Sequence, residues 1–221
     1  MLILPNTAFA TFAPCVFTLG IPFCVSERFS FSSLLIGPFS LPLSARLFFS
    51  LVSSESLYPN LVHAPEFLTA ANAVSDYVNG SFAIIGGSTT AYRNEAERII
   101  RLSQPNLNSI NHCSISEASF AKYTINSFLA TKVIFMNEMA QLAEDNQCNW
   151  NNIKQAVGQD KRLGASHMQV PGPDGEFGFG GMCFPKDTSA LLKYAESTGQ
   201  NLNVLDVAVK KNLILRLTGN N

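Results

Sequence analysis

Residues 114–144 read SISEASFAKYTINSFLATKVIFMNEMAQLAE. Ser114 and Glu117 stand three residues apart, the spacing of a capping box, in which each side chain hydrogen-bonds the backbone N–H of the other residue. After this start, apolar residues recur at helical spacing, namely Ala118, Ala121, Ile125, Phe128, Leu129, Phe135, Met136, Met139 and Leu142. The pattern predicts one helix from Ser114 to about Glu144, long enough to organise a domain.

The segment before this helix has the pattern of an α/β unit. Residues 82–85 are a short apolar run that ends in Gly86 and Gly87, and an amphipathic stretch continues to Arg101. A strand, a tight turn and a helix in this order are the unit from which α/β sheets are built. We therefore expect a small α/β part before the long helix.

The segment after the long helix predicts further helices around one long loop. A shorter helix is expected over 149–157, and the glycine- and proline-rich residues 164–181 predict a loop, a length that is often functional. Helices are expected over 186–198, where Gly199 provides the stop, and over 204–217. No internal repeat is present. The fold class expected from Leu61 onward is thus an α/β part followed by a mostly α-helical region.

One cysteine lies between the glycines of this loop and the next helix. Residues 178–187 read GFGGMCFPKD, and Pro185 suits a first helical turn, where its missing N–H costs no hydrogen bond. Cys183 should then lie just before a helix N-terminus, which favours the thiolate, the nucleophilic form. The alternative is that Cys183 is a small buried apolar residue.

Two other segments carry residues suited to chemistry. Lys122 and Asn126 are four apart on the long helix, so they share a face and can converge on one ligand, although such a pair is more often only solvated. Residues 64–68 read APEFL, and Glu66 taken alone would be a surface charge.

Together these blocks resemble the UDP-glucose/GDP-mannose dehydrogenase family. The family's Pro-Glu-Phe-Leu segment is similar to residues 64–68, its central helix to residues 122–132 with Asn137 and Glu138, and its catalytic-cysteine motif to residues 178–187. The resemblance covers about 61–212. It implies that residues 61–113 are the end of a Rossmann-type NAD-binding domain and that residues 114–217 are a helical central domain with dimerisation and catalytic roles.

The resemblance also implies an NAD-dependent, two-step oxidation of a sugar-nucleotide alcohol, such as that of UDP-glucose, to a carboxylate. Cys183 would attack the intermediate aldehyde, and a thioester would then be hydrolysed. Lys122 would stabilise oxyanions, and Asn126 would hydrogen-bond the reacting oxygen or a water. Asp187 would orient water or take protons, and Glu66 would be the base for hydrolysis. The residues implied to bind the sugar nucleotide are Phe67, Leu68, Phe179 and Gly180.

The long helix at 114–145 is implied to form a homodimer. A second hypothesis is therefore an inactive dimerisation module or fragment without turnover. A cysteine hydrolase is weaker, because no histidine is placed in the sequence to activate Cys183.

Two departures from the family are visible. Residues 1–60 contain no Gly-x-Gly-x-x-Gly turn to hold the pyrophosphate of NAD, so we expect this chain to bind NAD poorly and not to turn over alone. The family commonly has a second glutamate four residues after the first, and this chain has Ala70, which puts the water-positioning role in doubt.

Composition excludes several classes of protein. With 15 basic and 16 acidic residues, the chain has no basic surplus to bind nucleic acid. The five cysteines are irregularly spaced, which argues against a disulfide framework and favours a cytoplasmic protein. The spacing of cysteines and histidines matches no zinc motif. Residues 2–26 are free of charge, but prolines interrupt them, so we expect residues 1–60 to be an atypical, loosely ordered segment, native or frameshifted, rather than a membrane anchor.

Overall fold

The computed structural model describes residues 60–69 and 72–219. They form two compact units, one ending at Lys122 and the other beginning at Tyr123, so the division falls within a single long helix. The predicted irregular segment 1–60 lies almost wholly outside the described residues, as does Ala70. Among the described residues, no helix is both long and apolar enough to cross a bilayer.

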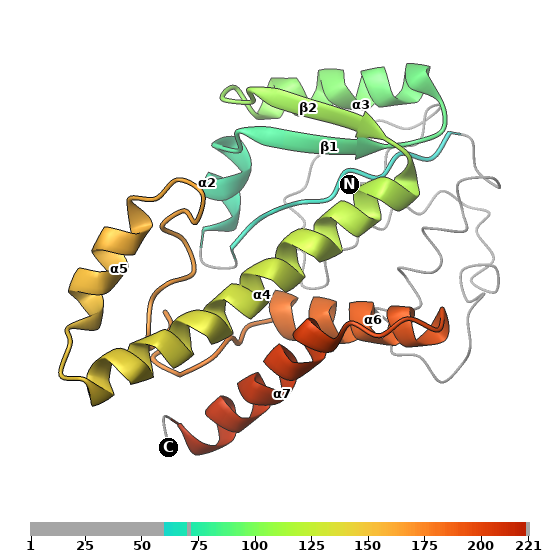
Figure 1. Cartoon of the computed structure of the whole chain (residues 1–221). Coiled ribbons are helices and arrows are strands. Elements are labelled where there is room, and N and C mark those ends of the chain that lie inside the picture. Colours follow the sequence, from blue (N-terminus) through green and yellow to red (C-terminus); the bar gives the residue numbers. More distant parts are fainter. Residues whose placement is uncertain (1–59, 70–71, 220–221) are drawn as a thin grey trace. The chain divides into compact units, whose positions relative to one another are not determined.

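The first unit is built around two parallel strands. Strand β1 (Phe82–Gly86) pairs with β2 (Ser109–Cys113), and helix α3 (Thr90–Ser103) connects them and runs along the strands (Figure 1). A short helix, α2 (Ala73–Val78), precedes β1. The core of this unit consists of aliphatic side chains from the entering chain, β1, α3 and the turn before β2, namely Val62, Ala64, Ala83, Ile85, Ala96, Ile100 and Leu107.

The predicted strand, turn and helix are confirmed in this unit, whereas α2 and β2 are additional. Strand β2 has no sequence signature, because its residues SINHC are mostly polar and none is fully buried. Gly86 is buried, and a Cβ there would lie 2.7 Å from the Cβ of Ala118 and 2.9 Å from the Cα of Ile115. The glycine at the end of β1 therefore lets the start of the long helix pack closely against the strand.

The long helix α4 (Ile115–Asp145) confirms the predicted element almost to the residue. The Glu117 N–H donates to Ser114 Oγ at 3.1 Å, and the Ser114 N–H donates to Glu117 Oε2 at 2.7 Å. These two bonds are the capping box expected from the sequence, and they satisfy donors that a helix start leaves without partners.

The second unit consists of the rest of α4 and three further helices. These are α5 (Trp150–Gly158), α6 (Cys183–Ser197) and α7 (Asn203–Thr218), and residues 159–182 contain no helix or strand. Helix α6 begins three residues before the predicted start at 186, and Gly199 after it adopts φ +74°, as a helix stop requires. The core joins α4, the loop and α7 through Ala130, Ile134, Phe179, Ala208 and Leu215.

Candidate functional site

Two predicted site residues of the second unit are hydrogen-bonded to each other. The Asn126 amide on α4 donates to Asp187 Oδ2 on α6 at 2.5 Å, and both side chains are almost fully buried. The other carboxylate oxygen, Oδ1, accepts from Lys186 Nζ at 2.6 Å. Hydrogen bonds to an ionised group are among the strong ones, so both carboxylate oxygens are held by the protein in a fixed direction.

Tyr123 shares the environment of this carboxylate. Burial raises the pKa of the Tyr123 hydroxyl well above its usual value, and the charge of Asp187 raises it further. Tyr123 therefore stays a neutral phenol throughout the neutral pH range.

Cys183 is the first residue of α6, one turn before Asp187, and its side chain is exposed. Pro185 occupies the first turn of the helix, as predicted. The backbone N–H groups of this turn lack helical acceptors, so Cys183 lies at the electropositive end of α6. The cysteine is thus accessible to a reagent or substrate from solvent.

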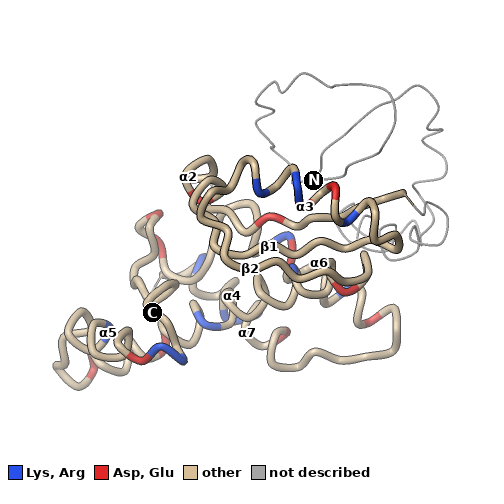
Figure 2. The backbone as a smooth tube through the Cα atoms, turned by 90° about the horizontal axis from the view of Figure 1, so that it is seen from above, with Lys and Arg blue, Asp and Glu red and all other residues tan. Residues whose placement is uncertain are grey.

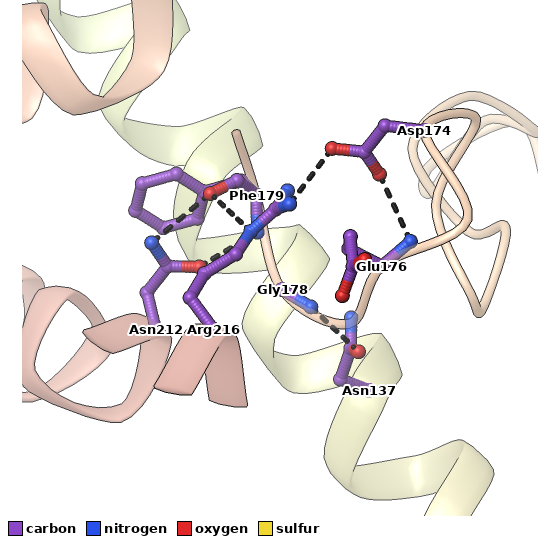
Figure 3. A network of polar contacts seen from close by, with 7 residues as sticks. All are labelled: Asn137, Asp174, Glu176, Gly178, Phe179, Asn212 and Arg216. Carbon is purple, nitrogen blue, oxygen red and sulfur yellow. Dashed lines mark hydrogen bonds and ion pairs between the residues drawn. The ribbon is translucent and has the colours of Figure 1, made fainter. Parts of the chain in front are cut away.

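The glycine-rich segment before Cys183 is held by side chains from two helices (Figure 3). On α4, Asn137 Oδ1 accepts from the Gly178 N–H at 3.0 Å. On α7, Asn212 accepts from the Phe179 N–H at 2.6 Å and donates to the Phe179 carbonyl at 3.0 Å. Arg216 donates to the same carbonyl at 3.2 Å and to Asp174 at 2.8 Å. The hydrogen bond from Arg216 lowers the pKa of Asp174.

These contacts account for two of the glycines. A Cβ on Gly178 would collide with the Asn212 side chain, and one on Gly180 would lie 2.5 Å from the Arg216 guanidinium. The Phe179 ring is buried in the core of the unit, and both backbone polar groups of Phe179 have protein partners. Side chains of α7 therefore contact the backbone at Phe179 and Gly180, the two loop residues that the resemblance implies in sugar-nucleotide binding.

Sequence reasoning missed His167, which belongs to the long loop. Its ring lies 5.5 Å from the ring of Phe184, the residue after Cys183. His167 has a left-handed backbone with φ +61°, and its Nδ1 is buried without a hydrogen-bond partner. Burial lowers its pKa, and the charge of Lys132 lowers it further, so His167 is neutral at pH 7. No sequence spacing indicates this placement, because an irregular loop without helix or strand separates the two rings.

Lys132 is buried on α4 and fixes the start of the same loop. Its Nζ donates to the carbonyls of Leu163 and Gly164 at 2.9 and 3.0 Å. Burial lowers the pKa of Lys132. Two carbonyl acceptors offset part of the cost of placing this charge away from water.

In the first unit, Lys122 contacts Glu66, the predicted base, and Phe67, a predicted substrate-binding residue. Its Nζ donates to the Glu66 carbonyl and lies 5.0 Å from the centre of the Phe67 ring, a cation–π distance. The Phe67 ring packs at 4.9 Å against the ring of Phe82. The Lys122 ammonium is therefore oriented by the segment that carries Glu66.

A cavity of about 330 Å³ adjoins this segment. Glu66, Phe67 and Leu68 line it together with α2, the start of β1 and Gln104. The Oε1 atom of Gln104 is buried and has no hydrogen-bond partner. Leu68 thus lies at the cavity wall. Gln104 is a polar residue of the same wall, and nothing in the sequence after α3 indicates this position.

The turn after β1 does not fit the pyrophosphate of NAD. The Gly87 N–H, which such a turn would aim at a phosphate, donates to the Cys113 carbonyl at 2.9 Å, and the Gly87 carbonyl accepts from Arg93. A Cβ on Gly87 would lie 3.1 Å from the Leu61 carbonyl, so this glycine serves chain packing. The turn after β1 therefore does not offer the phosphate cradle that the implied cofactor needs.

Charged side chains and possible metal ligands are spread over the described residues. Basic and acidic residues are interspersed along the described backbone (Figure 2). Within the described ranges, no three histidine, cysteine or acidic residues gather to hold a metal ion.

Residues 116–213 match the family model described as the UDP-glucose/GDP-mannose dehydrogenase family, central domain. The chain is 33% identical over 153 residues to the UDP-glucose 6-dehydrogenase TuaD of Bacillus subtilis, which covers 69% of this chain and 32% of that protein. It is 36% identical over 151 residues to a UDP-glucose 6-dehydrogenase of Pseudomonas aeruginosa, which covers 67% of this chain and 32% of that protein. The chain spans about a third of the length of these relatives.

Solved structures show the same relationship. A UDP-glucose dehydrogenase from Pyrobaculum islandicum superposes with a TM-score of 0.60 at 29% identity, over 69% of this chain and 34% of that one. A 3-hydroxyisobutyrate dehydrogenase of Mycobacterium tuberculosis, 18% identical with a TM-score of 0.56 over 74% of this chain and 59% of that one, shares the fold alone. The motif order, the helical architecture and these similarities agree, and the chain belongs, through its central domain, to the UDP-glucose/GDP-mannose dehydrogenase family.

Proposed function

We propose that this chain carries the covalent step of a sugar-nucleotide dehydrogenase, in which Cys183 captures a sugar-nucleotide aldehyde. The observation that carries the proposal is the placement of Cys183, exposed at the start of α6, one turn from a buried carboxylate that Asn126 and Lys186 hold in place. The relatives named as UDP-glucose 6-dehydrogenases support UDP-glucose or a related sugar nucleotide as the substrate class.

The proposed step is a thiolate addition. The sulfur of Cys183 forms a bond to the aldehyde carbon, and the carbonyl electron pair moves to oxygen, which takes up a proton to give a thiohemiacetal. Lys122 would stabilise the developing oxyanion, and Asn126 would hydrogen-bond the reacting oxygen or a water. Asp187 would orient water or accept a proton. Glu66 would be the base for the water that hydrolyses the thioester, which the thiohemiacetal can become only where bound NAD accepts its hydride.

Cys183 should react with limiting iodoacetamide near neutral pH severalfold faster than Cys148. Both thiols are exposed, but Cys183 begins α6, whereas Cys148 follows the end of α4, close to Glu144 and Asp145. A helix N-terminus stabilises an anionic sulfur, while a helix C-terminus and carboxylates disfavour it. Peptide mass spectrometry measures both rates in one sample.

The half-buried Cys113 provides an internal reference for slow reaction. A Cys183 rate equal to or below that of Cys148 would remove the basis for assigning Cys183 as the nucleophile.

A second candidate function, homodimerisation through α4, is favoured by a row of exposed apolar side chains. Phe128, Phe135 and Leu142 recur every seven residues and are 66, 56 and 54% exposed. Next to them, a groove of about 160 Å³ between α4 and α7 is lined by Phe135, Val207 and neighbouring residues. A continuous apolar row of this kind is covered when a second copy of the helix packs against it.

A further inference from the structure

We propose that Asn212 and Arg216 of α7 are positioning residues for Cys183, acting through the backbone and ring of Phe179. The inference rests on the proposed function only for the role of Cys183. The contacts of the two α7 side chains stand independently of that role.

The Asn212 side chain pairs with Phe179 as a neighbouring strand would. Its carbonyl oxygen accepts from the Phe179 N–H at 2.6 Å, and its amide nitrogen donates to the Phe179 carbonyl at 3.0 Å. The Phe179 residue is buried, so without Asn212 its N–H would lose its partner away from water. One side chain thus fixes both polar groups of this peptide segment.

Arg216 adds a second anchor from the next turn of α7. Its guanidinium donates to the Phe179 carbonyl at 3.2 Å and to Asp174 Oδ2 at 2.8 Å, so it ties two points of the loop to one helix (Figure 3). The Arg216 side chain is 23% exposed and that of Asp174 is 46% exposed. Because Arg216 is partly buried and its guanidinium also donates to the Phe179 carbonyl, this ion pair is more restrictive than a surface pair.

The glycines of the loop fit these two side chains. A Cβ at Gly178 would meet Asn212, and a Cβ at Gly180 would meet Arg216. The pattern Gly-Phe-Gly therefore lets both α7 side chains approach the main chain, and Phe179 between the glycines supplies the ring that enters the core.

The anchored segment reaches Cys183 by two routes. Only Gly180, Gly181 and Met182 separate Phe179 from Cys183 in the chain. In addition, the Phe179 ring packs edge-on against the ring of Phe184, with centres 6.0 Å apart and planes at 85°. The first turn of α6 is thus held on the loop side by Phe179, while the Asn126–Asp187 bond holds the helix one turn later.

The test replaces Asn212 with leucine in the full chain and measures backbone hydrogen exchange by mass spectrometry. We expect faster exchange in peptides spanning 177–184, with α5 peptides unchanged, because only the Phe179 amide loses its acceptor. Cys183 alkylation should slow about threefold, since a frayed first turn of α6 stabilises an anionic sulfur less. Asn212→Asp, which keeps the acceptor oxygen, should restore most of the protection.

Arg216→Met is the second variant, since its side chain is partly exposed and its loss leaves the Asn212 pair in place. Lys210→Met is the matched control, because Lys210 lies on the same helix but its ion pair is an exposed one with Asp206 of α7 and not with the loop. Unchanged exchange at 177–184 in Asn212→Leu, or faster exchange with an unchanged Cys183 rate, would overturn the inference. A slow Cys183 in the parent chain would instead count against the proposed function, while the exchange result still decides the anchoring.

Discussion

Replacing Asn126 with aspartate should destabilise the second unit by about 3 kcal/mol at pH 7, the scale expected when a buried charge loses its partner. Asn126 and Asp187 are 6 and 2% exposed, and the amide donates to the carboxylate at 2.5 Å. The variant would place two carboxylates at this distance in a buried site. Urea unfolding followed by the fluorescence of the single tryptophan, Trp150, measures the loss, because Trp150 lies in this unit.

The loss should depend on pH with a definite sign. Two facing carboxylates raise the pKa of one of them in the folded state, so the folded variant binds a proton that the unfolded chain releases above its ordinary pKa. The penalty should therefore be largest above the raised pKa and should shrink as the pH falls toward the ordinary carboxyl value of about 4. Gln155→Glu, an exposed amide-to-acid change on α5, is the control. An Asn126→Asp variant as stable as this control at pH 7 would contradict the buried contact.

Phe128→Glu should convert a homodimer of this chain into a monomer. In a twofold interface each substitution acts twice, and loss of two buried phenylalanine contacts costs about 4 kcal/mol, or roughly a thousandfold in the dissociation constant. Phe128 is 66% exposed within one chain, so the change should leave the fold of the chain itself intact. Light scattering over a range of concentrations measures the molecular mass.

Leu163→Glu is a matched control, because Leu163 is 50% exposed in the long loop and lies away from the α4 row in sequence. It introduces the same charge without touching Phe128, Phe135 or Leu142. A parent chain that stays monomeric at all concentrations would refute the dimer, and a dimer that survives Phe128→Glu would place the interface elsewhere.

Local rules explain why the helices were predictable. The capping box at Ser114 and Glu117, the apolar period of α4 and the stop at Gly199 each depend on residues within a few positions of one another. Strand β2 was not predicted because its polar residues form a strand only by pairing with β1. The paired residues are 27 positions apart in the chain, as Phe82 and Ser109 are.

The residues of the candidate site were likewise predictable only in part. The resemblance named Asn126 and Asp187, and the structure brings them together. It could not indicate Asn212, Arg216 or His167, because their partners lie far along the chain and no spacing rule connects them. The resemblance implies that Phe179 and Gly180 bind the sugar nucleotide, and the structure adds that side chains of α7 approach the backbone at Gly178 and Gly180. A glycine in the sequence indicates that another group can approach the backbone closely, but it does not identify that group.

The most direct test of the central claim, that Cys183 captures a sugar-nucleotide aldehyde, is protection of this thiol from alkylation. The full chain would be incubated with the 6-aldehyde of UDP-glucose, with UDP-glucose itself as the matched control, and then treated with limiting iodoacetamide. Because the thiohemiacetal consumes the thiolate without any other reactant, the account predicts that the aldehyde slows labelling of Cys183 well beyond UDP-glucose and leaves Cys148 unaffected. Equal labelling of Cys183 in the two samples would contradict the account.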